Sequence, residues 1–376
     1  MKRVYLDANA TTPLDPRVRA AMEPYLDCGN ASSPHAEGRA ARDAIDRARA
    51  DVAALIGVVD QEIVFTSGGT ESNGMALLGG LRASGKNRAL CSAVEHPSVL
   101  RTLLALRPAT DIVVAPVDRG GRVDADLEIP EDTGIVSIMR ANNETGAIQP
   151  VAPIAARAAA AGALMHTDAV QACGKIPVSA RDLGVHMLSM SAHKFHGPKG
   201  VGALWVSREV KIGPLYHGGE HERGLRSGTE NVGAVVGFGE AARIARQEME
   251  ARLARWRELG ATLEARIRAE VPQVIVNSPE DPGDRVPNTL NVTIPGVEGE
   301  AALLGVDLEG FAVATGSACS SGAAEPSHVL RAMGLSEEHT EQSLRISMHA
   351  QTCEKDVISF VNTLARVVKN LRALSV

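Results

Sequence analysis

The chain has 376 residues, of which 44% are hydrophobic and 22% charged, a composition that excludes a disordered, collagenous or coiled-coil protein. The formal net charge is −6 and no basic stripe is present, so we expect no nucleic acid as the main partner. No apolar run approaches the roughly 18 residues of a membrane-spanning helix, and the N-terminus lacks an apolar signal-peptide core. We therefore expect a cytoplasmic protein without a membrane partner.

The cysteine pattern argues against a disulfide framework or a structural zinc site. The number is odd, the spacings are wide, and no C-x-x-C motif occurs. One reactive thiol among buried, inert ones is the remaining interpretation. The five cysteines are Cys28, Cys91, Cys173, Cys319 and Cys353.

Taken in chain order, the hydrophobic pattern alternates between helix and strand. Apolar residues three and four apart predict a helix over Ala40–Ile56. Short apolar runs, each followed by polar or glycine residues, predict strands. Helices alternating with such strands indicate an α/β domain with a mostly parallel sheet. The runs are Ile63–Thr66, Ile135–Met139, Leu164–His166, Met187–Met190 and Ala203–Val206.

The last third of the chain has a different pattern. A long, charge-rich helix is predicted over Ala241–Val271, followed by an apolar run at Asn288–Ile294 and a final amphipathic helix over Val357–Leu371. We place a domain boundary inside the long helix. The expected large domain covers residues 16–255, and a smaller α+β domain combines residues 1–15 with residues 256–376.

Chemistry-bearing residues follow the predicted strands, where open α/β sheets bind their ligands. Ser67–Asn73 follows the first strand and opens a helix, so its glycines and Thr70 form a candidate phosphate cradle. Taken alone, this segment fits a simple helix-capping turn better than a phosphate site.

The next strand ends supply an imidazole, a carboxamide, a carboxylate and a lysine: His96, Asn143, Asp168 and Lys194. Each has a simpler interpretation as a turn residue, a helix cap or a surface lysine. Together with a phosphate cradle they favour a pyridoxal phosphate (PLP) site. The lysine would form the Schiff base, the carboxylate would pair with the pyridine nitrogen, and His96 would stack on the ring.

These residues belong to motifs that, in their shared order, resemble those of the NifS/IscS-like cysteine desulfurases. That family lies in the class V aminotransferase group of fold-type I PLP enzymes, and the resemblance extends over almost the whole chain. The motifs are Tyr5–Thr12, Ser67–Asn73, Glu95–Pro97, Asn142–Gly146, His166–Gln171, His193–Lys194, Gly197–Gly200, Arg226–Asn231 and Gly316–Ser321.

The resemblance implies a role for each matching position. Lys194 would be the Schiff-base lysine, Asp168 the partner of the pyridine nitrogen, and His96 the stacking residue and an acid/base. Gln171 would donate a hydrogen bond to the phenolic oxygen of the cofactor, and Asn143 would lie near that oxygen and the substrate. Thr229 would bind a phosphate across the dimer interface, and Arg345 would bind the substrate carboxylate. The residues implied to bind the phosphate within one chain are Gly69, Thr70, Ser191 and His193.

Cys319 is implied as the nucleophile that takes the sulfur and becomes a persulfide. Its neighbours from Gly316 to Gly322 are all small, so we expect a segment that moves between the cofactor and an acceptor. The resemblance implies no resident metal, with Cys319 a candidate for transient ligation of an iron–sulfur cluster. The implied partners are L-cysteine, a second copy of the chain, and a sulfur acceptor or iron–sulfur scaffold protein.

The expected activity is therefore conversion of L-cysteine to L-alanine and a Cys319 persulfide. The alternatives are a selenocysteine lyase, another class V aminotransferase, or a non-catalytic sulfur-transfer scaffold. The sequence departs from the family pattern at two places. Ala8-Asn9 replaces two consecutive asparagines, and His349-Ala350-Gln351 lacks the arginine and aromatic residue usual after Arg345-Ile346-Ser347.

Overall fold

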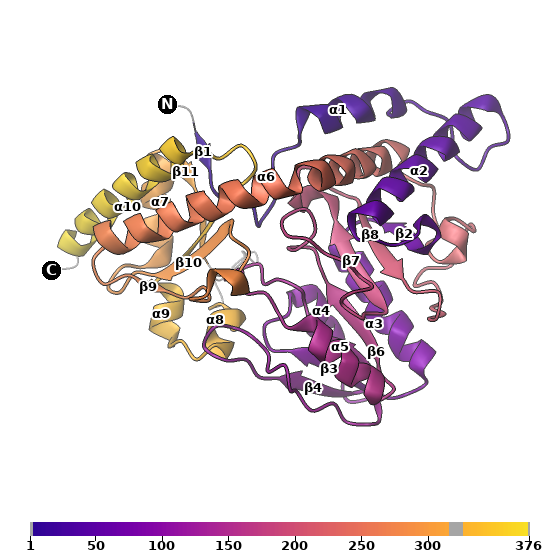
Figure 1. The fold of residues 1–376 in the computed structure, drawn as a ribbon, viewed down its shortest axis with the longest axis horizontal. Coiled ribbons are helices and arrows are strands. Elements are labelled where there is room, and N and C mark those ends of the chain that lie inside the picture. Colours follow the sequence, from indigo (N-terminus) through magenta and orange to yellow (C-terminus); the bar gives the residue numbers. More distant parts are fainter. Residues whose placement is uncertain (1–2, 316–325, 375–376) are drawn as a thin grey trace.

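The computed structural model describes residues 3–315 and 326–374. In this part of the chain the largest sheet has seven strands in the order β2-β8-β7-β6-β5-β3-β4 (Figure 1). Neighbours from β7 to β4 are parallel, and β8 is antiparallel to both of its neighbours. The expectation of a mostly parallel sheet is confirmed. The strands are β2 (Ile63–Thr66), β3 (Arg88–Ser92), β4 (Asp111–Ala115), β5 (Thr133–Ser137), β6 (Leu164–Asp168), β7 (Met187–Ser191) and β8 (Gly202–Val206).

Helices cover both faces of this sheet. Alternate residues of one strand belong to different apolar clusters: Phe65 packs with α2, α5 and α6, whereas Val64 packs with α3 and α4. This alternation follows from the two-residue period of a strand, and it gives a three-layer arrangement. The helices of this part are α1 (Pro16–Met22), α2 (Ala36–Leu55), α3 (Gly69–Ser84), α4 (Pro97–Leu104), α5 (Val151–Ala160) and α6 (Val232–Glu270).

A second, smaller body surrounds an antiparallel sheet in the order β12-β13-β10-β9. A short parallel pair, β1 (Val4–Tyr5) with β11 (Phe311–Ala312), brings the N-terminus to this body. Its own apolar cluster includes Leu6, Trp256 and Phe360. Its other elements are β9 (Ile275–Val276), β10 (Thr289–Thr293), α7 (Gly299–Leu308), β12 (Ala314–Thr315), α8 (His328–Ala332), α9 (Glu337–Glu341), β13 (Ser343–Ser347) and α10 (Glu354–Leu374).

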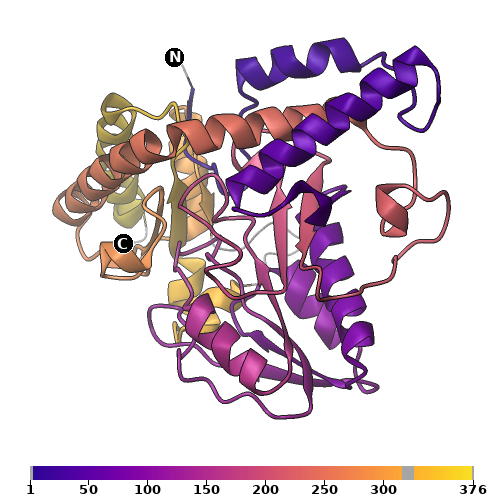
Figure 2. The same cartoon turned by 45° about the vertical axis from the view of Figure 1, so that its right-hand side comes forward.

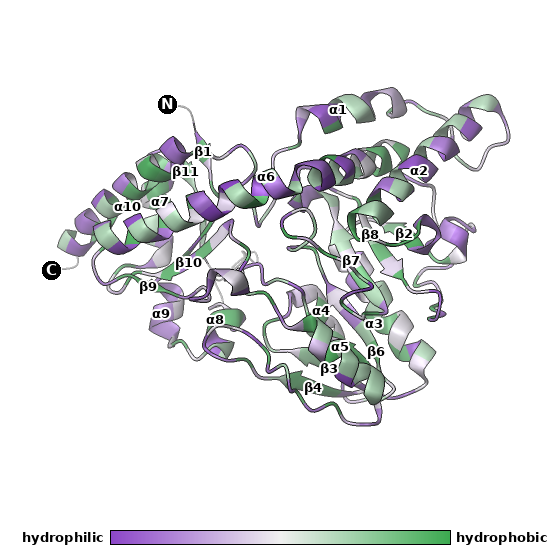
Figure 3. Ribbon diagram, in the orientation of Figure 1, coloured by the Kyte–Doolittle hydropathy of each residue, from purple (hydrophilic) through white to green (hydrophobic). Residues whose placement is uncertain are grey.

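Helix α6 connects the two bodies. Its first half, from Val232 to Ala245, belongs to the core of the large sheet, and its second half, from Trp256 to Ile267, belongs to the core of the small one. Figure 1 shows it running from the small body across the upper part of the molecule to the large one, and in Figure 3 hydrophilic and hydrophobic residues alternate along it, as they do along α10. The same helix therefore fixes how the two bodies sit around the space between them.

Three helices begin earlier than the sequence predicts, α10 by three residues and α2 and α6 by more. The side chain of His35 accepts a hydrogen bond from Gly38, so α2 starts at Ala36 rather than Ala40. Helix α6 starts at Val232 because Asn231 caps it, and glycines in its first turns hide the apolar pattern. Gly239 is required there, since a Cβ atom would lie 2.5 Å from the Cα of Ala48 on α2.

Among residues 3–315 and 326–374, no helix is both long and apolar enough to cross a lipid bilayer. The same part of the chain contains no cluster of His, Cys, Asp or Glu side chains suited to holding a metal ion.

Candidate active site

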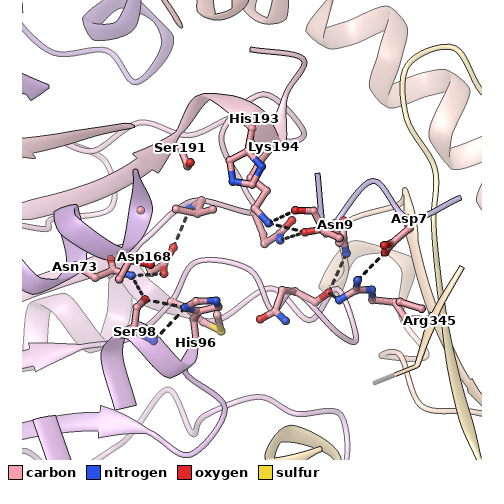
Figure 4. Close-up of a pocket in the computed structure, with 18 of the residues that line it drawn as sticks. Asp7, Asn9, Asn73, His96, Ser98, Asp168, Ser191, His193, Lys194 and Arg345 are labelled. Carbon is pink, nitrogen blue, oxygen red and sulfur yellow. Dashed lines mark hydrogen bonds and ion pairs between the residues drawn. The ribbon is translucent and has the colours of Figure 1, made fainter. Parts of the chain in front are cut away.

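A cavity of about 560 Å³ lies between the two bodies, at the carboxyl ends of the central strands. Figure 4 shows side chains from both bodies pointing into it. It brings together most of the residues singled out from the sequence. Those residues are Gly69, Thr70, His96, Asn143, Asp168, Gln171, Ser191, His193, Lys194 and Arg345.

Lys194 ends the single turn η3 (Ala192–Lys194) directly after β7. Its Nζ atom donates hydrogen bonds to the backbone oxygens of Asn9, at 2.7 Å, and Ala10, at 2.8 Å. Burial, followed by the nearby Arg345, lowers the pKa of Lys194 to about 8. About a tenth of a lysine with this pKa is neutral at pH 7, far more than of an ordinary lysine, and the neutral amine is the state that attacks an aldehyde.

Asp168 is the last residue of β6 and is buried. Its Oδ1 accepts a hydrogen bond from the backbone N–H of Val170 at 2.9 Å, and its Oδ2 accepts one from Nδ2 of Asn73 at 2.7 Å. Two bonds leave acceptor capacity on a carboxylate, so Asp168 has room for one more donor from the cavity. A protonated pyridine nitrogen is such a donor.

The N-terminus of α3 forms an open anion cradle. Its N-cap residue, Gly68, has φ of +156° and no side chain, so the first N–H groups of the helix receive no side-chain cap. At Gly69 a Cβ atom would lie 2.8 Å from Cγ2 of Val170 and would fill the approach to these groups. Thr70, Ser191 and His193 add polar groups to the same cavity wall. This combination suits a phosphate group.

Arg345, on β13, faces the opposite side of the cavity (Figure 4). Its Nη2 contacts Oδ1 of Asp7 at 2.7 Å, and its Nη1 donates to the backbone oxygen of Asn143 at 3.2 Å. Its Nε is buried and has no hydrogen-bond partner in the described part of the chain. The guanidinium is thus held in place by Asp7 while keeping an unused donor for an anionic ligand.

Gln171 takes part in a buried network that the sequence did not predict. Its Nε2 donates to the backbone oxygen of Asn9 at 2.9 Å, and its Oε1 accepts from Nζ of Lys175. Lys175 also donates to Oδ1 of Asn9 at 2.7 Å. Burial lowers the pKa of Lys175 well below its ordinary value. Lys175 therefore holds the Gln171 amide with its N–H end toward Asn9 and the cavity.

Asn9 is the centre of this network, and it is the single asparagine kept where the family pattern often has two. Its Nδ2 donates to the backbone oxygen of Asn143 at 3.0 Å and to Oγ1 of Thr289 at 2.9 Å. In the sequence, the four-residue spacing from Gln171 to Lys175 is a signal that points to Lys175. Asn9 is visible only as a departure from the family pattern, which does not show its role.

Asn73 and Ser98 were also missed as site residues. Nδ2 of Asn73 joins Oδ2 of Asp168 to Oγ of Ser98, which lies 2.7 Å from Nδ1 of His96. In the sequence, Asn73 is recognisable only as the last residue of the Ser67–Asn73 motif. Its place one helical turn beyond Thr70 was the available signal.

One expected site residue, Thr229, lies elsewhere, and another cannot be placed. Thr229 is exposed and lines a separate cavity of about 200 Å³ beside Thr66 and Glu222, so a single chain does not bring it to Lys194. Cys319 lies outside the described residues. The other four cysteines carry free thiols, and burial raises the pKa of Cys91 and of Cys173.

The segment His349-Ala350-Gln351, where the sequence departs from the family pattern, does not line the cavity. His349 packs near His196 and Tyr5, with ring centroids 6.0 and 6.2 Å apart, and the backbone N–H of Ala350 donates to Nε2 of His196 at 3.3 Å. His349, Ala350 and Gln351 are absent from the lining of the Lys194 cavity. They therefore shape the packing behind it.

The donor set fits pyridoxal phosphate. A lysine with a lowered pKa, a buried carboxylate with spare acceptor capacity, and an uncapped helix N-terminus line one cavity of sufficient size. When bound, this cofactor would be held by Lys194, Asp168 and the α3 cradle.

Comparisons with known proteins agree with this geometry. The aminotransferase class-V family profile matches residues 4–360. The chain is 44% identical over 385 residues to the cysteine desulfurase IscS of Dictyoglomus turgidum, covering 100% of this chain and 97% of that protein. It is 45% identical to a cysteine desulfurase of Sinorhizobium fredii, covering 99% and 98%.

Among solved structures, one titled NifS-like protein superposes with a TM-score of 0.91 at 36% identity, covering 98% of this chain and all of that one. A NifS-like protein of Rickettsia africae superposes with a TM-score of 0.87 at 33% identity, covering 98% and 99%. Fold, cavity and relatives agree, and the chain belongs to the class-V aminotransferase family of PLP enzymes, among the NifS/IscS-like cysteine desulfurases.

Proposed function

We propose that this chain is a PLP-dependent L-cysteine desulfurase that yields L-alanine and leaves the sulfur on Cys319 as a persulfide. The carbon–sulfur bond of the substrate breaks and a sulfur–sulfur bond to Cys319 forms. L-cysteine and one protein thiol thus become L-alanine and one persulfide, with no external oxidant. The acceptor of that sulfur, by the resemblance, is an iron–sulfur scaffold or another carrier protein.

The observation that carries this proposal is the presence of Lys194, Asp168 and Arg345 around one cavity. PLP, bound through its aldehyde, supplies an electron sink for negative charge at the substrate α-carbon. Asp168 keeps an acceptor for the cofactor ring nitrogen, because only two of its acceptor sites are used by Val170 and Asn73.

Lys194 is the base for the substrate α-proton. Its amine would be available for this role when the cofactor holds the substrate, and its pKa of about 8 suits proton transfer near neutral pH. Arg345 orients the substrate carboxylate through its guanidinium, which Asp7 holds toward the cavity. His96 faces the same space and contributes through Nε2, since its Nδ1 is engaged by Ser98.

We further propose a cytoplasmic homodimer in which Thr229 completes the phosphate site of the partner. Its distance from the Lys194 cavity in one chain supports this, as does the exposure of Tyr216 in the segment between β8 and α6. That segment, residues 207–231, runs along the outer edge of the large body at the right of Figure 2. The division into domains 16–255 and 1–15 with 256–376 is supported by two apolar cores that meet along α6.

The test is a product balance with the PLP-loaded protein. Given L-cysteine and a thiol reductant, it should form alanine and sulfide in equal amounts, and the Lys194→Ala variant should form neither. Turnover of L-selenocysteine far above that of L-cysteine would assign the protein to the selenocysteine lyases instead. Alanine formation from pyruvate and an amino donor would make it an aminotransferase, and no turnover by a PLP-loaded protein would favour the scaffold alternative.

A further inference from the structure

A continuous chain of hydrogen bonds connects Asp168 to His96 at one wall of the cavity (Figure 4). Nδ2 of Asn73 donates to Oδ2 of Asp168 at 2.7 Å and to Oγ of Ser98 at 2.8 Å. That hydroxyl oxygen lies 2.7 Å from Nδ1 of His96. Asn73 and Ser98 are both buried, so these bonds are protected from competition by bulk water.

In this series of hydrogen bonds, the donor and the acceptor of each bond are fixed. Both oxygens of Asp168 act as acceptors, one toward Val170 and one toward Asn73, so the amide of Asn73 must present its NH₂ group to Asp168. The opposite orientation would place two oxygens in contact. The present orientation leaves Oδ1 of Asn73 buried without a hydrogen-bond partner in the described part of the chain. The carboxylate therefore fixes the amide even at that cost.

The direction carries over to His96. The second N–H of the Asn73 amide is donated to Oγ of Ser98, which leaves the hydroxyl proton of Ser98 free to point to its other neighbour, Nδ1 of His96. The backbone N–H of Ser98 also donates to Nδ1, at 3.1 Å, because His96 is the N-cap residue of α4. Two donors meet at Nδ1, so this nitrogen carries no proton and the neutral ring carries its proton on Nε2.

The same geometry disfavours the imidazolium ion. A proton on Nδ1 would face the N–H and the hydroxyl proton of Ser98, and the N-terminus of α4 disfavours positive charge. The charged or titratable groups around the ring are Asp168 on β6, which favours the cation, and Lys194 after β7 and His328 on α8, which oppose it. Desolvation by the surrounding protein lowers the pKa of His96 and acts in the same sense.

We propose that His96 acts as a neutral hydrogen-bond donor through Nε2–H, and that Asn73 and Ser98 are the positioning residues that hold it in this form. This rests on the proposed function, and it replaces the acid/base role expected for His96 with a polarising one. A neutral histidine held at a helix N-terminus is suited to donate a hydrogen bond to an electron-rich atom of the bound ligand. Proton transfer at the substrate is then left to Lys194.

The experiment observes the ring of His96 directly. PLP-loaded protein with ¹⁵N-labelled histidine is studied by NMR from about pH 6 to about pH 9, the range in which an ordinary histidine titrates. The His96 signals are assigned as those missing in the His96→Gln variant. We expect a proton on Nε2, an unprotonated Nδ1, and no titration over this range.

The Ser98→Ala variant tests the positioning role. Loss of the hydroxyl donor should weaken the preference for the Nε2–H form about fivefold, the equivalent of one hydrogen bond of about 1 kcal/mol. Thr102→Ala is the matched control, because it removes a hydroxyl from the same helix that bonds only to the backbone oxygen of Ser98. We expect the His96 signals of that variant to match those of the parent.

An imidazolium signal from His96 in the parent protein above about pH 6 would overturn the proposal. So would His96 signals in Ser98→Ala that equal those of the parent, because the positioning role would then be absent. Failure of the proposed function looks different. In that case the ring signals would be as expected, and the same sample would form no alanine from L-cysteine.

Discussion

The expected reactivity of Lys194 follows from the buried position and the hydrogen-bond partners of its amine. Its Nζ contacts the backbone oxygens of Asn9 and Ala10 and has no hydrogen bond to a carboxylate in the described part of the chain. Burial therefore lowers its pKa to about 8 without the compensation that a close ion pair would give. Lys175 is also buried, but its Nζ is engaged by Asn9 and Gln171 outside the main cavity.

The first prediction is that PLP forms its covalent bond with Lys194. Borohydride reduction of the loaded protein followed by peptide mass mapping should find the pyridoxyl group on Lys194. Lys175 and the exposed Lys199 are internal controls. The label on either of them would show that the assignment of the cofactor lysine is wrong.

The second prediction concerns Cys319, the thiol assigned from the sequence. Cys319→Ser should bind PLP and still change its spectrum when L-cysteine is added, because Lys194, Asp168 and Arg345 are intact. Sulfide release with a thiol reductant should fall to background, since the substrate sulfur has no protein thiol to attack it.

Cys353→Ala is the matched control for that variant, because Cys353 also belongs to the C-terminal third, is partly accessible, and should not affect turnover. Desulfuration by Cys319→Ser at the parent rate, or a persulfide that maps to another cysteine, would contradict the assignment.

Site residues could be predicted from the sequence where they follow strands. The carboxyl ends of parallel strands meet at one sheet edge, so Asp168 and Lys194 had to lie close together. Arg345 depended on the resemblance, because its partner Asp7 is 338 positions away. Asn9 and Lys175 could not be predicted as site residues, because their roles depend on hydrogen bonds between the two bodies and because a lysine is usually exposed.

At the scale of elements, the N-terminus of α3 is the feature that makes the cavity an anion site. Its N–H groups are accessible only because Gly69 has no side chain. Gly69→Ala would place a methyl group 2.8 Å from Cγ2 of Val170, so either the strand end or the helix must shift.

The third prediction is that Gly69→Ala weakens PLP binding about tenfold or more, corresponding to strain of at least about 1.4 kcal/mol in the cradle. The measurement is a titration of the apoprotein with PLP, followed by absorbance. Gly74→Ala is the control on the same helix, because its Cβ would lie at an ordinary 3.7 Å from Leu215. Equal affinities for the two variants would show that the α3 N-terminus does not hold the phosphate.

A buried ion pair anchors the 207–231 segment to the large sheet. Arg49 of α2 donates two hydrogen bonds of 2.7 Å to Glu222, and Glu222 also accepts one from the backbone N–H of Phe65 at 2.8 Å. Both side chains are nearly inaccessible to solvent. This pair positions the start of the strained turn at Glu222 and Arg223, whose φ angles are +46° and +56°.

The fourth prediction is that Arg49→Met destabilises the fold by about 3–5 kcal/mol, because it leaves the Glu222 carboxylate buried and unpaired. Urea unfolding of the parent and the variant measures the difference. The double variant Arg49→Met with Glu222→Gln should recover part of the loss, since no charge then remains buried. A single variant as stable as the parent would show that the pair does not anchor this segment.

Element types were predictable because their patterns are local, and the fold class followed from their alternation. The start of α6 could not be predicted, because Gly233, Gly237 and Gly239 interrupt the apolar pattern that marks a helix. These glycines serve close approaches, Gly239 to α2 and Gly237 to Met22, whose Sδ would lie 2.6 Å from an added Cβ. Tertiary contact thus selects residues that weaken the local signal.

At the scale of the whole molecule, each body has a main apolar core, a small further cluster around Val94 and Leu330 joins the two bodies, and the cavity lies between them. Asp7 and Arg345 reach it from the smaller body, and Lys194 and Asp168 from the larger one. One chain supplies every expected site residue of the described part except Thr229, which lines the separate cavity beside Glu222. A second copy of the chain is the simplest source of a threonine for the phosphate.

The fifth prediction is that two defective chains complement each other. Lys194→Ala removes the cofactor lysine of its own site, and Thr229→Ala weakens the phosphate contact of its partner's site by about tenfold, the value of one hydrogen bond to a charged group. In a mixed dimer, the chain that keeps Lys194 receives an intact Thr229 from its partner. That site should therefore bind PLP with the affinity of the parent.

Light scattering should first show a dimer for the parent and for both variants. After subunit exchange of the two variants, a PLP titration should show a class of sites with parental affinity that neither variant has alone. A mixture of two Thr229→Ala chains carrying different tags is the control for the exchange procedure and should show no such class. If the parent is an active monomer, or if exchange restores no parental sites, Thr229 acts within its own chain. The 207–231 segment would then have to move toward Lys194, and the Arg49–Glu222 pair that anchors it would have to break with every such movement.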